Sequence, residues 1–448
     1  MTSSVRLRNF WDNVRATYWF VPAVMTLLAA VLALTLFWVE QTIPNYLLQN
    51  LLQNKWYIFP PVSITEARGE LNSIADTSLG VVGVVFSITL VPLSITSTQY
   101  GSIVLRSFLR DRGTQFVLGA YTSTTFYCLF LLLALANVSN QTVQLPVTIA
   151  FYMLAASLLL LIYFFHHVAD SLQSSTVVEQ VSREVEQVIE QEYPLDNARA
   201  SFDHQRAEEL IRHTALNGEV GELVTSNQEG YVRAIDYDQL IHIASEYKLI
   251  LRIECLPGDF VSRGDPLLIA WPRPLDKRMR LLANRAYMLG KNRTLFQDTE
   301  FGIYLIVIIA VRALSPAIND PNTPVLCLNR LGAVLGMLAE RQRRSPYYYD
   351  KDGQLRLISD SVSFERLAGV AFDMIREYGR TNAEILINML ETIKSVTAHT
   401  HSDTERRVLL KHAALIEHDS HIGLPSDYDQ QRVHESYDET VRAIGLGN

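Results

Sequence analysis

The sequence predicts an α-helical membrane protein in which four transmembrane helices are followed by a mixed cytoplasmic part. Two observations predict this division. Four long apolar stretches lie in the first third of the chain, and a polar remainder follows without another such stretch. The mean hydropathy of +0.10 is low for a chain that lies wholly in the membrane. We therefore expect a membrane part joined to a larger soluble part.

Each apolar stretch is close to the ~20 residues that a helix needs to cross a bilayer. A bilayer interior offers no water to backbone amides, so such stretches satisfy their own hydrogen bonds as helices. The first stretch follows several arginines, as in a signal peptide, but no small-residue cleavage pattern comes after it. We interpret it as a retained anchor. The predicted spans are about 18–39, 74–98, 116–138 and 145–165.

The distribution of basic residues predicts the orientation of these spans. The amino-terminal segment and the link between the second and third spans carry the basic clusters. The loops 40–73 and 139–144 carry only Lys55 and Arg68 between them. Both termini are therefore expected in the cytoplasm. The arginines of the two clusters are Arg6, Arg8, Arg15, Arg106, Arg110 and Arg112.

Four segments are predicted along the chain. After the transmembrane domain comes a stalk that continues the fourth span as one helix, in which valines recur at three-then-four spacing from Val178 to Val188. Such a stripe is able to bring subunits together beneath the membrane, so we expect a homo-oligomer. The segments are the transmembrane domain 1–169, the stalk helix 170–193, the β-rich cytoplasmic module 194–272 and the helical cytoplasmic domain 273–448.

The β-rich module contains four predicted strands that are separated by glycine turns. Its turns at 257–259 and 264–265 resemble the pattern of barrel-sandwich (biotinyl/lipoyl-like) folds. No lysine lies in the context of the modified hairpin of those folds, so no attached cofactor is expected. In the helical domain, we predict an apolar core helix at 301–314 and an exposed hairpin at 347–358. The predicted strands are 222–226, 231–235, 249–255 and 266–270.

One face of the second span carries small and hydroxyl residues, whereas the opposite face is aliphatic. Such a face either lets another helix approach closely or lines a narrow wet path, and helix packing is the commoner use. Pro92 is expected to kink the span, which suits a gate or an ordinary bundle. Asp76, at the outer start of the span, is the acidic candidate. The pore-lining or helix-packing candidates are Gly80, Gly83, Ser87, Pro92, Ser94 and Thr98.

The densest polar cluster of the soluble part lies at 319–324. The structural interpretation is a tight loop whose Asn or Thr caps the helix 325–341, with Pro324 in its first turn. The functional interpretation is a binding loop around an ion or small anion. Capping accounts for most of these residue types without a ligand. The ligand-loop candidates are Arg312, Asn319, Asp320 and Asn322.

Composition and motifs argue against several functional classes. A net charge of -8 argues against a nucleic-acid partner. The chain has no phosphate-binding loop, HExxH or GxSxG motif, so we predict no enzyme and no catalytic residue. The histidines match no zinc spacing and fit solvated helix faces, so no metal or other cofactor is predicted. The three cysteines lie outside the outward loops, which predicts no disulfide.

Several motifs resemble those of one bacterial family. They are YWFVP at 18–22, GVVFSITL at 83–90, RDRGTQ at 110–115 and ALSPAINDP at 313–321. They are similar to motifs of the bacterial predicted membrane protein family DUF2254, and the similarity covers nearly the whole chain. The resemblance implies a bacterial inner-membrane protein. The family supplies no activity, substrate or catalytic residue.

Two functional hypotheses follow from these observations. The leading one is an oligomeric channel or channel-like transport protein, whose second span lines the path and whose cytoplasmic domain regulates it. The alternative is a membrane-anchored sensor or scaffold, in which the β-rich module and the loop at Asn319 bind a ligand or a protein partner. The expected partners are the lipid bilayer, further copies of the chain, and an ion or small ligand.

Overall fold

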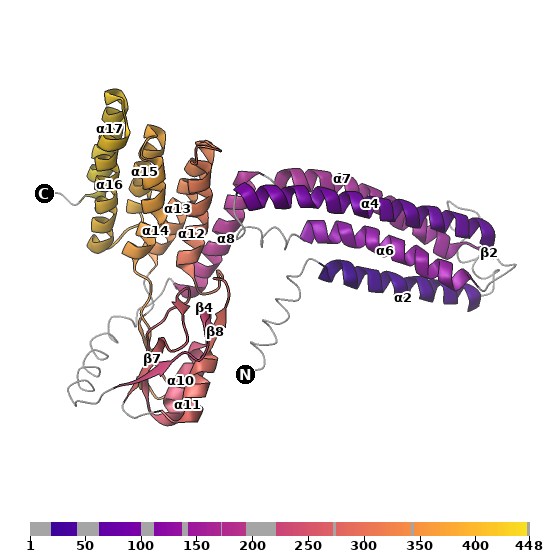
Figure 1. Cartoon of the computed structure of the whole chain (residues 1–448), viewed down its shortest axis with the longest axis horizontal. Helices are drawn as coiled ribbons and strands as arrows, with labels where there is room; N and C mark the ends of the chain where they lie inside the picture. Colours follow the sequence, from indigo (N-terminus) through magenta and orange to yellow (C-terminus); the bar gives the residue numbers. More distant parts are fainter. Residues whose placement is uncertain are drawn as a thin grey trace. The chain divides into compact units, whose positions relative to one another are not determined.

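The computed structural model describes residues 19–42, 62–99, 112–136, 142–171, 173–193, 221–271, 275–341 and 345–445. Its contacts divide the chain into two compact units, Met1–Thr176 and Val177–Asn448. The first unit is built mainly from long helices, and the second combines sheets with helices (Figure 1). The basic flanks and the predicted helix-containing segment before residue 221 lie largely outside the described residues.

Among the described residues, four helices are long and apolar enough to cross a membrane, as the sequence predicts. The second helix begins at Ile64 rather than at residue 74. Its first turns are helical but carry Glu66, Arg68 and Glu70, which lower the hydropathy there. The four helices are α2 (Phe20–Thr42), α4 (Ile64–Gln99), α6 (Arg112–Leu135) and α7 (Leu145–Ser171).

Helix α6 is the central helix of the first unit. It contacts α2, α4 and α7, and half of its span is buried, against 28% or less for the other three spans. Its Thr124 hydroxyl lies 3.2 Å from the Ser157 hydroxyl of α7, and Thr26 of α2 donates to Thr122 over 3.3 Å. The hydroxyls of α6 also donate to carbonyls of the preceding turn. They therefore act in helix packing.

Two charged side chains form hydrogen bonds with the backbone at the helix termini at one end of this unit. Arg68 of α4 donates to the carbonyl oxygens of Leu135 and Ala136, where α6 ends. Glu40 of α2 accepts from the backbone nitrogens of Gln144 (2.8 Å) and Leu145 (3.4 Å), where α7 begins. A cation at a helix C-terminus and an anion at a helix N-terminus both complement the helix dipole. The short strands β1 (Val62–Ser63) and β2 (Thr142–Val143) pair at this end.

The second unit contains two sheets that share a core with α10 (Tyr237–Tyr247) and α11 (Lys277–Ala286). The larger sheet has the order β3-β7-β5-β10-β9, and the smaller has the order β6-β4-β8. The barrel-sandwich arrangement of this module stays a prediction. The strands are β3 (Glu222–Thr225), β4 (Gly230–Ile235), β5 (Ile250–Ile253), β6 (Phe260–Val261), β7 (Pro266–Trp271), β8 (Tyr287–Gly290), β9 (Tyr347–Tyr349) and β10 (Leu355–Ile358).

The predicted hairpin at 347–358 forms, and its turn at 351–354 is exposed, but its strands are buried or half-buried. Strand β10 pairs in parallel with β5 through Leu357 and Leu251, and Leu355 and Leu357 are buried. Arg356 and Asp350, at the turn of the hairpin, form an ion pair of 2.6 Å. The alternating leucines are the signal of a strand with one buried face. The sheet of the β-rich module therefore includes strands from beyond residue 273. The strands of the hairpin are part of this sheet, which corrects their predicted exposure.

The predicted stalk is a separate helix, α8 (Ser174–Glu192), because α7 ends at Ser171. Three valines of its stripe, Val178, Val181 and Val185, are buried within the second unit, and Val188 is half-buried. An added Cβ at Gly302 of α12 (Thr299–Ala313) would lie 2.5 Å from Cγ2 of Val185. The stripe therefore packs on the helical core of its own chain. This corrects the expectation that it joins subunits, since an amphipathic helix buries its apolar face on the nearest apolar surface.

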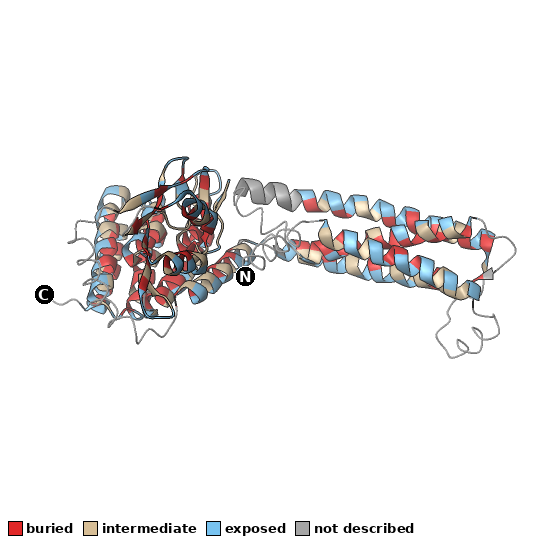
Figure 2. Ribbon diagram, turned by 90° about the horizontal axis from the view of Figure 1, so that it is seen from below, coloured by how far each residue is buried: buried red, intermediate tan, exposed pale blue. Residues whose placement is uncertain are grey.

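The remaining helices stack in pairs, with buried faces turned toward one another (Figures 1 and 2). The predicted core helix at 301–314 is α12, in which most residues are buried. The last helix, α17, was not expected because its sequence is mostly polar. These helices are α13 (Asn322–Glu340), α14 (Phe364–Gly379), α15 (Ala383–Thr397), α16 (Asp403–Gly423) and α17 (Asp427–Ile444).

A buried ion pair holds the N-terminus of α12. The Asp298 carboxylate accepts from the backbone nitrogen of Phe301 (2.9 Å) and, through both oxygens, from Arg293 (2.9 and 2.8 Å). The Asp298 side chain is 3% exposed. Burial raises the pKa of Asp298, and the hydrogen bonds from Arg293 lower it in part. Arg293 therefore offsets part of the cost of burying this carboxyl group.

The packing of α8 on α12 predicts a strong effect of Gly302→Ala. The added methyl would meet Val185 Cγ2 at 2.5 Å and Leu295 Cδ2 at 3.1 Å, so the helices must separate. We expect the full chain to lose about 1–3 kcal/mol of unfolding free energy, measured by thermal or denaturant unfolding. The control is Gly369→Ala in α14, where the added Cβ meets only the end of Asp373 at 3.3 Å. The control is expected to gain about 0.4–1 kcal/mol. Equal effects of the two changes would contradict this packing.

The ion pair predicts a pH-dependent effect of Arg293→Met. Without its partner, the buried Asp298 carboxylate is uncompensated, and we expect a loss of about 3–5 kcal/mol near neutral pH. The folded pKa of Asp298 then rises further above its unfolded value of ~4, so the folded state binds this proton more tightly. Stability therefore falls as the pH rises through the window between the two pKa values.

The measurement is unfolding of this variant at several pH values. Arg432→Met serves as its control, because the Arg432–Glu384 pair is exposed (side chains 40% and 59%). Removing such a pair costs less than about 1 kcal/mol. A loss in Arg293→Met as small as in the control, or independent of pH, would show that the pair does not stabilise α12.

Candidate functional site

The predicted polar face of the second span lies on the exposed side of α4. Gly80, Gly83 and Ser87 are exposed, whereas Val85 and Thr89 face the bundle. A Cβ added at Gly80 or Gly83 would meet no described atom within 4 Å. These small residues therefore do not serve the packing of α4 on the described helices of its own chain.

The same face continues toward the start of the helix. Gly69, Ser73 and Asp76 are exposed and precede Gly80 at steps of four and three. We use the name α4 stripe for this set, whose spacing of four and three places its members on one side of the helix. The sequence analysis missed the first two members because the apolar window began after them, although their spacing was visible. The α4 stripe consists of Gly69, Ser73, Asp76, Gly80, Gly83 and Ser87.

Asp76 lies at the start of the apolar run of α4 (Ile64–Gln99), as the sequence predicts. The turns before it carry Glu66, Arg68 and Glu70, whereas the residues that follow it are mostly apolar. With a rise of 1.5 Å per residue, Asp76 lies about 12 Å further along the helix than Arg68. An ionisable side chain inside a membrane helix is costly in lipid and usually faces protein or water.

The hydroxyl groups on the exposed face of α4 donate their hydrogen bonds to backbone carbonyls of the same helix. Ser73 donates to the carbonyl of Gly69 (3.0 Å), Thr77 to that of Ser73 (2.7 Å), and Ser87 to that of Gly83 (2.9 Å). Each hydroxyl oxygen keeps lone pairs that are free to accept. Together with the Asp76 carboxylate, these oxygens make the stripe a row of acceptors. Such a row suits cations or donor groups rather than anions.

The other candidates of the second span lie near the end of α4. The helix continues through Pro92, Ser94 and Thr98 to Gln99. The side chains of these three residues lie outside the part of the chain for which burial is described. The candidate site therefore rests on the residues up to Leu90.

The loop at Asn319 leads into α13, which begins at Asn322 rather than at residue 325. The side chain that bonds its first turn is that of Asp320, the residue before the N-cap Pro321, and not that of an Asn or Thr as predicted. The Asp320 carboxylate accepts from the backbone nitrogen of Asn322 (2.9 Å) and from the hydroxyl of Thr323 (2.5 Å) at the start of α13. The Thr323 hydroxyl holds the pKa of Asp320 below its usual value. Asn319 has a φ of 47°, which a loop asparagine tolerates. Arg312 contributes its backbone carbonyl to the same turn, accepting from Ser315.

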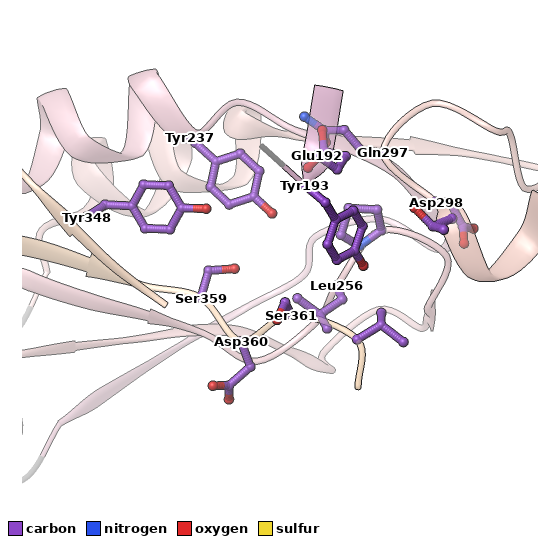
Figure 3. Close-up of a pocket in the computed structure, with 13 residues that line it drawn as sticks. Glu192, Tyr193, Tyr237, Leu256, Gln297, Asp298, Tyr348, Ser359, Asp360 and Ser361 are labelled. Carbon is purple, nitrogen blue, oxygen red and sulfur yellow. The ribbon is translucent and has the colours of Figure 1, made fainter. Parts of the chain in front are cut away.

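A small cavity lies beside the end of α8 (Figure 3). It has a volume of about 60 Å³, which is room for about two water molecules. The stacked rings of Tyr237 and Tyr348 form one wall, with centroids 5.5 Å apart, and Asp298 and Asp360 also line it. This size suits ordered water rather than an organic ligand.

A larger groove of about 630 Å³ lies between α14 and α16. His412 lines it but is 4% exposed, so this histidine does not lie on a solvated face as predicted. Its ring packs on Phe372, and burial lowers its pKa. Acidic and basic side chains mix along the groove, so its charge selects no ligand class. No group of three potential metal ligands occurs among the residues that the structure describes.

Comparisons with known proteins agree with the membrane character of the chain. The family described as "Predicted membrane protein (DUF2254)" matches residues 15–395. Relatives include uncharacterized protein Rv1290c of Mycobacterium tuberculosis and uncharacterized protein Mb1321c of Mycobacterium bovis. Each is 30% identical over 356 residues, which cover 77% of this chain and 66% of the relative. No solved structure matches the chain.

The family match covers most of the chain, and it includes all four apolar helices and the α4 stripe. The motifs that the sequence analysis singled out also lie within residues 15–395, and they carry the same assignment. The chain spans just under two thirds of the length of the curated relatives that it matches. The protein belongs to the DUF2254 family of predicted membrane proteins.

Proposed function

We propose that this protein is an oligomeric, channel-like membrane protein in which the α4 stripes of several copies face one another around a path. One observation carries the proposal: the stripe is exposed in the single chain although it lies in an apolar helix. An aspartate at the centre of a membrane helix costs about 2.5–3.5 kcal/mol on insertion scales, and Asp76, at the start of the apolar run, bears a smaller part of that cost. The stripe is therefore expected to face protein or water rather than lipid.

The small residues of the stripe support contact between copies. Glycine and serine let helix backbones approach closely, and steps of four and three match the crossing of nearly parallel helices at about 20°. Gly80 and Gly83 have no described neighbour in their own chain, so their surface is free for a second copy. The proposed partner of the stripe is therefore the same stripe of another subunit.

The acceptor groups of the stripe support a wet path for cations. A ring of Asp76 carboxylates around an axis would attract cations, as carboxylate rings do in cation channels. The inward hydrogen bonds of Ser73 and Ser87 leave their oxygens available to water or to an ion. The permeant species of this proposal is therefore a small cation.

The second unit is the proposed regulatory part, on the cytoplasmic side of an inner membrane. The arginine-rich flanks support this orientation. Helix α8 begins three residues after the end of α7 and is packed into the core of the second unit. A movement of the core of the second unit would therefore be passed through α8 to α7, because the two helices are joined by a very short link.

Replacement of stripe residues by bulky ones tests the path. Gly83→Leu and Ser87→Leu add volume where the chain itself offers no contact, so we expect the fold to persist and the conductance to fall at least about tenfold. The measurement is planar-bilayer recording of purified protein. Leu159→Phe, on the exposed surface of α7 and outside the stripe, is the control and should conduct like the wild type. Absence of conductance in the wild type, or unchanged conductance in both stripe variants, would refute the proposal.

The charge of Asp76 gives a second test. Asp76→Asn keeps the size of the side chain and removes the negative charge, so we expect the preference for cations over anions to decrease. The measurement is the reversal potential under a potassium chloride gradient. Glu70→Gln, a half-buried acidic residue of the same helix outside the stripe, is the control and should leave the reversal potential unchanged. A reversal potential that does not move in Asp76→Asn would remove Asp76 from the path.

A further inference from the structure

The outer face of α11 is a basic surface on an acidic protein. The chain has a net charge of -8, yet α11 carries four basic residues and no acidic one. Its buried face, formed by Met279, Ala283 and Ala286, packs into the core of the second unit. The exposed basic residues are Lys277, Arg278, Arg280 and Arg285. We call them, together with Leu281, the α11 face.

The basic residues of the α11 face stand where helix stability disfavours them. Lys277 and Arg278 lie in the first turn, where the helix dipole disfavours cations by about 0.3–1 kcal/mol each. Four other helices of this unit, α14 to α17, have acidic residues in their first turns. The N-cap Asp276 stabilises the start of α11 by accepting from the Met279 backbone nitrogen, so the basic residues of the first turn are not explained by the stability of the helix.

Most of this charge is not paired among the residues that the structure describes. Arg280 forms an ion pair with Glu222. Lys277, Arg278 and Arg285 form no ion pair with any residue that the structure describes. The net positive charge of the face is therefore available to an external anion. Like charges that are held close together repel one another, so an anionic partner would relieve a cost that the free protein bears.

An exposed leucine lies in the middle of the basic residues. Leu281 is 45% exposed and follows Lys277 by four residues and precedes Arg285 by four, so all three share one side of the helix. A helix face with basic residues around an apolar one is typical of helices that lie at an anionic lipid surface. A nucleic-acid backbone offers phosphates but little apolar surface for the leucine. The combination therefore favours lipid over nucleic acid.

We propose that the α11 face binds anionic phospholipid headgroups at a membrane surface, with Leu281 entering the interface between them. The basic residues supply the attraction to the headgroups, and the leucine adds a small apolar contribution. The proposal rests on the four apolar helices, which tie the chain to a membrane, and on the charge of α11. It does not depend on conduction.

The test uses the full chain held in nanodiscs of phosphatidylcholine. These nanodiscs are mixed with separate lipid vesicles, and binding of the protein to the vesicles is measured by flotation. We expect binding to vesicles of equal parts phosphatidylcholine and phosphatidylglycerol, but not to phosphatidylcholine alone. Each basic residue near an anionic surface contributes about fivefold in affinity. The variant Lys277→Gln/Arg278→Gln/Arg285→Gln should therefore lose affinity on the order of a hundredfold. These side chains are exposed, so the variant is expected to fold.

The matched control removes the same charge elsewhere on the second unit. Lys248→Gln/Lys351→Gln/Arg407→Gln changes three exposed basic residues outside α11 and should alter affinity by less than about threefold, since distant charges are screened. In a separate variant, Leu281→Ser should weaken binding several-fold and leave its salt dependence unchanged. Equal losses in the two triple variants, or equal binding to both kinds of vesicle, would overturn the proposal. Tighter binding of single-stranded DNA than of the anionic vesicles would assign the face to nucleic acid instead.

Discussion

Inside a bilayer, polar atoms have no water to bond, and this constraint governs the first unit. The bundle meets it around α6, whose threonine hydroxyls bond to their own helix or to α2 and α7. At one end of the bundle, Arg68 and Glu40 satisfy the ends of α6 and α7. The buried hydroxyls of Tyr121 and Ser78 find no partner among the described residues. The α4 stripe is the exposed face on which a single chain leaves the constraint unmet. The proposed oligomer is the arrangement that would meet it.

In the second unit, the carboxylates of two aspartates are likewise supplied with hydrogen-bond donors by the fold. Asp298 is nearly inaccessible, yet it caps α12 and receives two hydrogen bonds from Arg293. Asp320 caps α13 in a comparable way with backbone and hydroxyl donors. Both aspartates therefore position helices. A polar cluster that looks like a binding loop in sequence can thus contribute a side chain that holds the start of a helix.

Local patterns predicted the elements of this protein well. The lengths and apolar character of the spans predicted four membrane helices, and alternation with glycine turns predicted β3, β4, β5 and β7. Errors arose where an element depends on residues far along the chain. Strand β10 is buried because β5 lies beside it, more than a hundred residues earlier in the sequence. Helix α17 has few apolar residues, yet it packs on α15.

The candidate site shows the same limit. The spacing of Gly80, Gly83 and Ser87 predicted a shared face, but not whether a neighbouring helix covers it. The structure shows that no described helix of the chain does. For the valines of α8 the outcome was the opposite, since Val178, Val181 and Val185 are buried by their own chain.

The sequence by itself determined which residues share a face and which segments are apolar enough for a membrane, because both properties depend on neighbours within a few residues. Only the tertiary structure decided what each face contacts. Burial depends on chain segments that are distant in sequence, and no local period encodes their position. For this reason the amphipathic face of α8 became core, the polar face of α4 remained open, and the basic face of α11 was left on the surface.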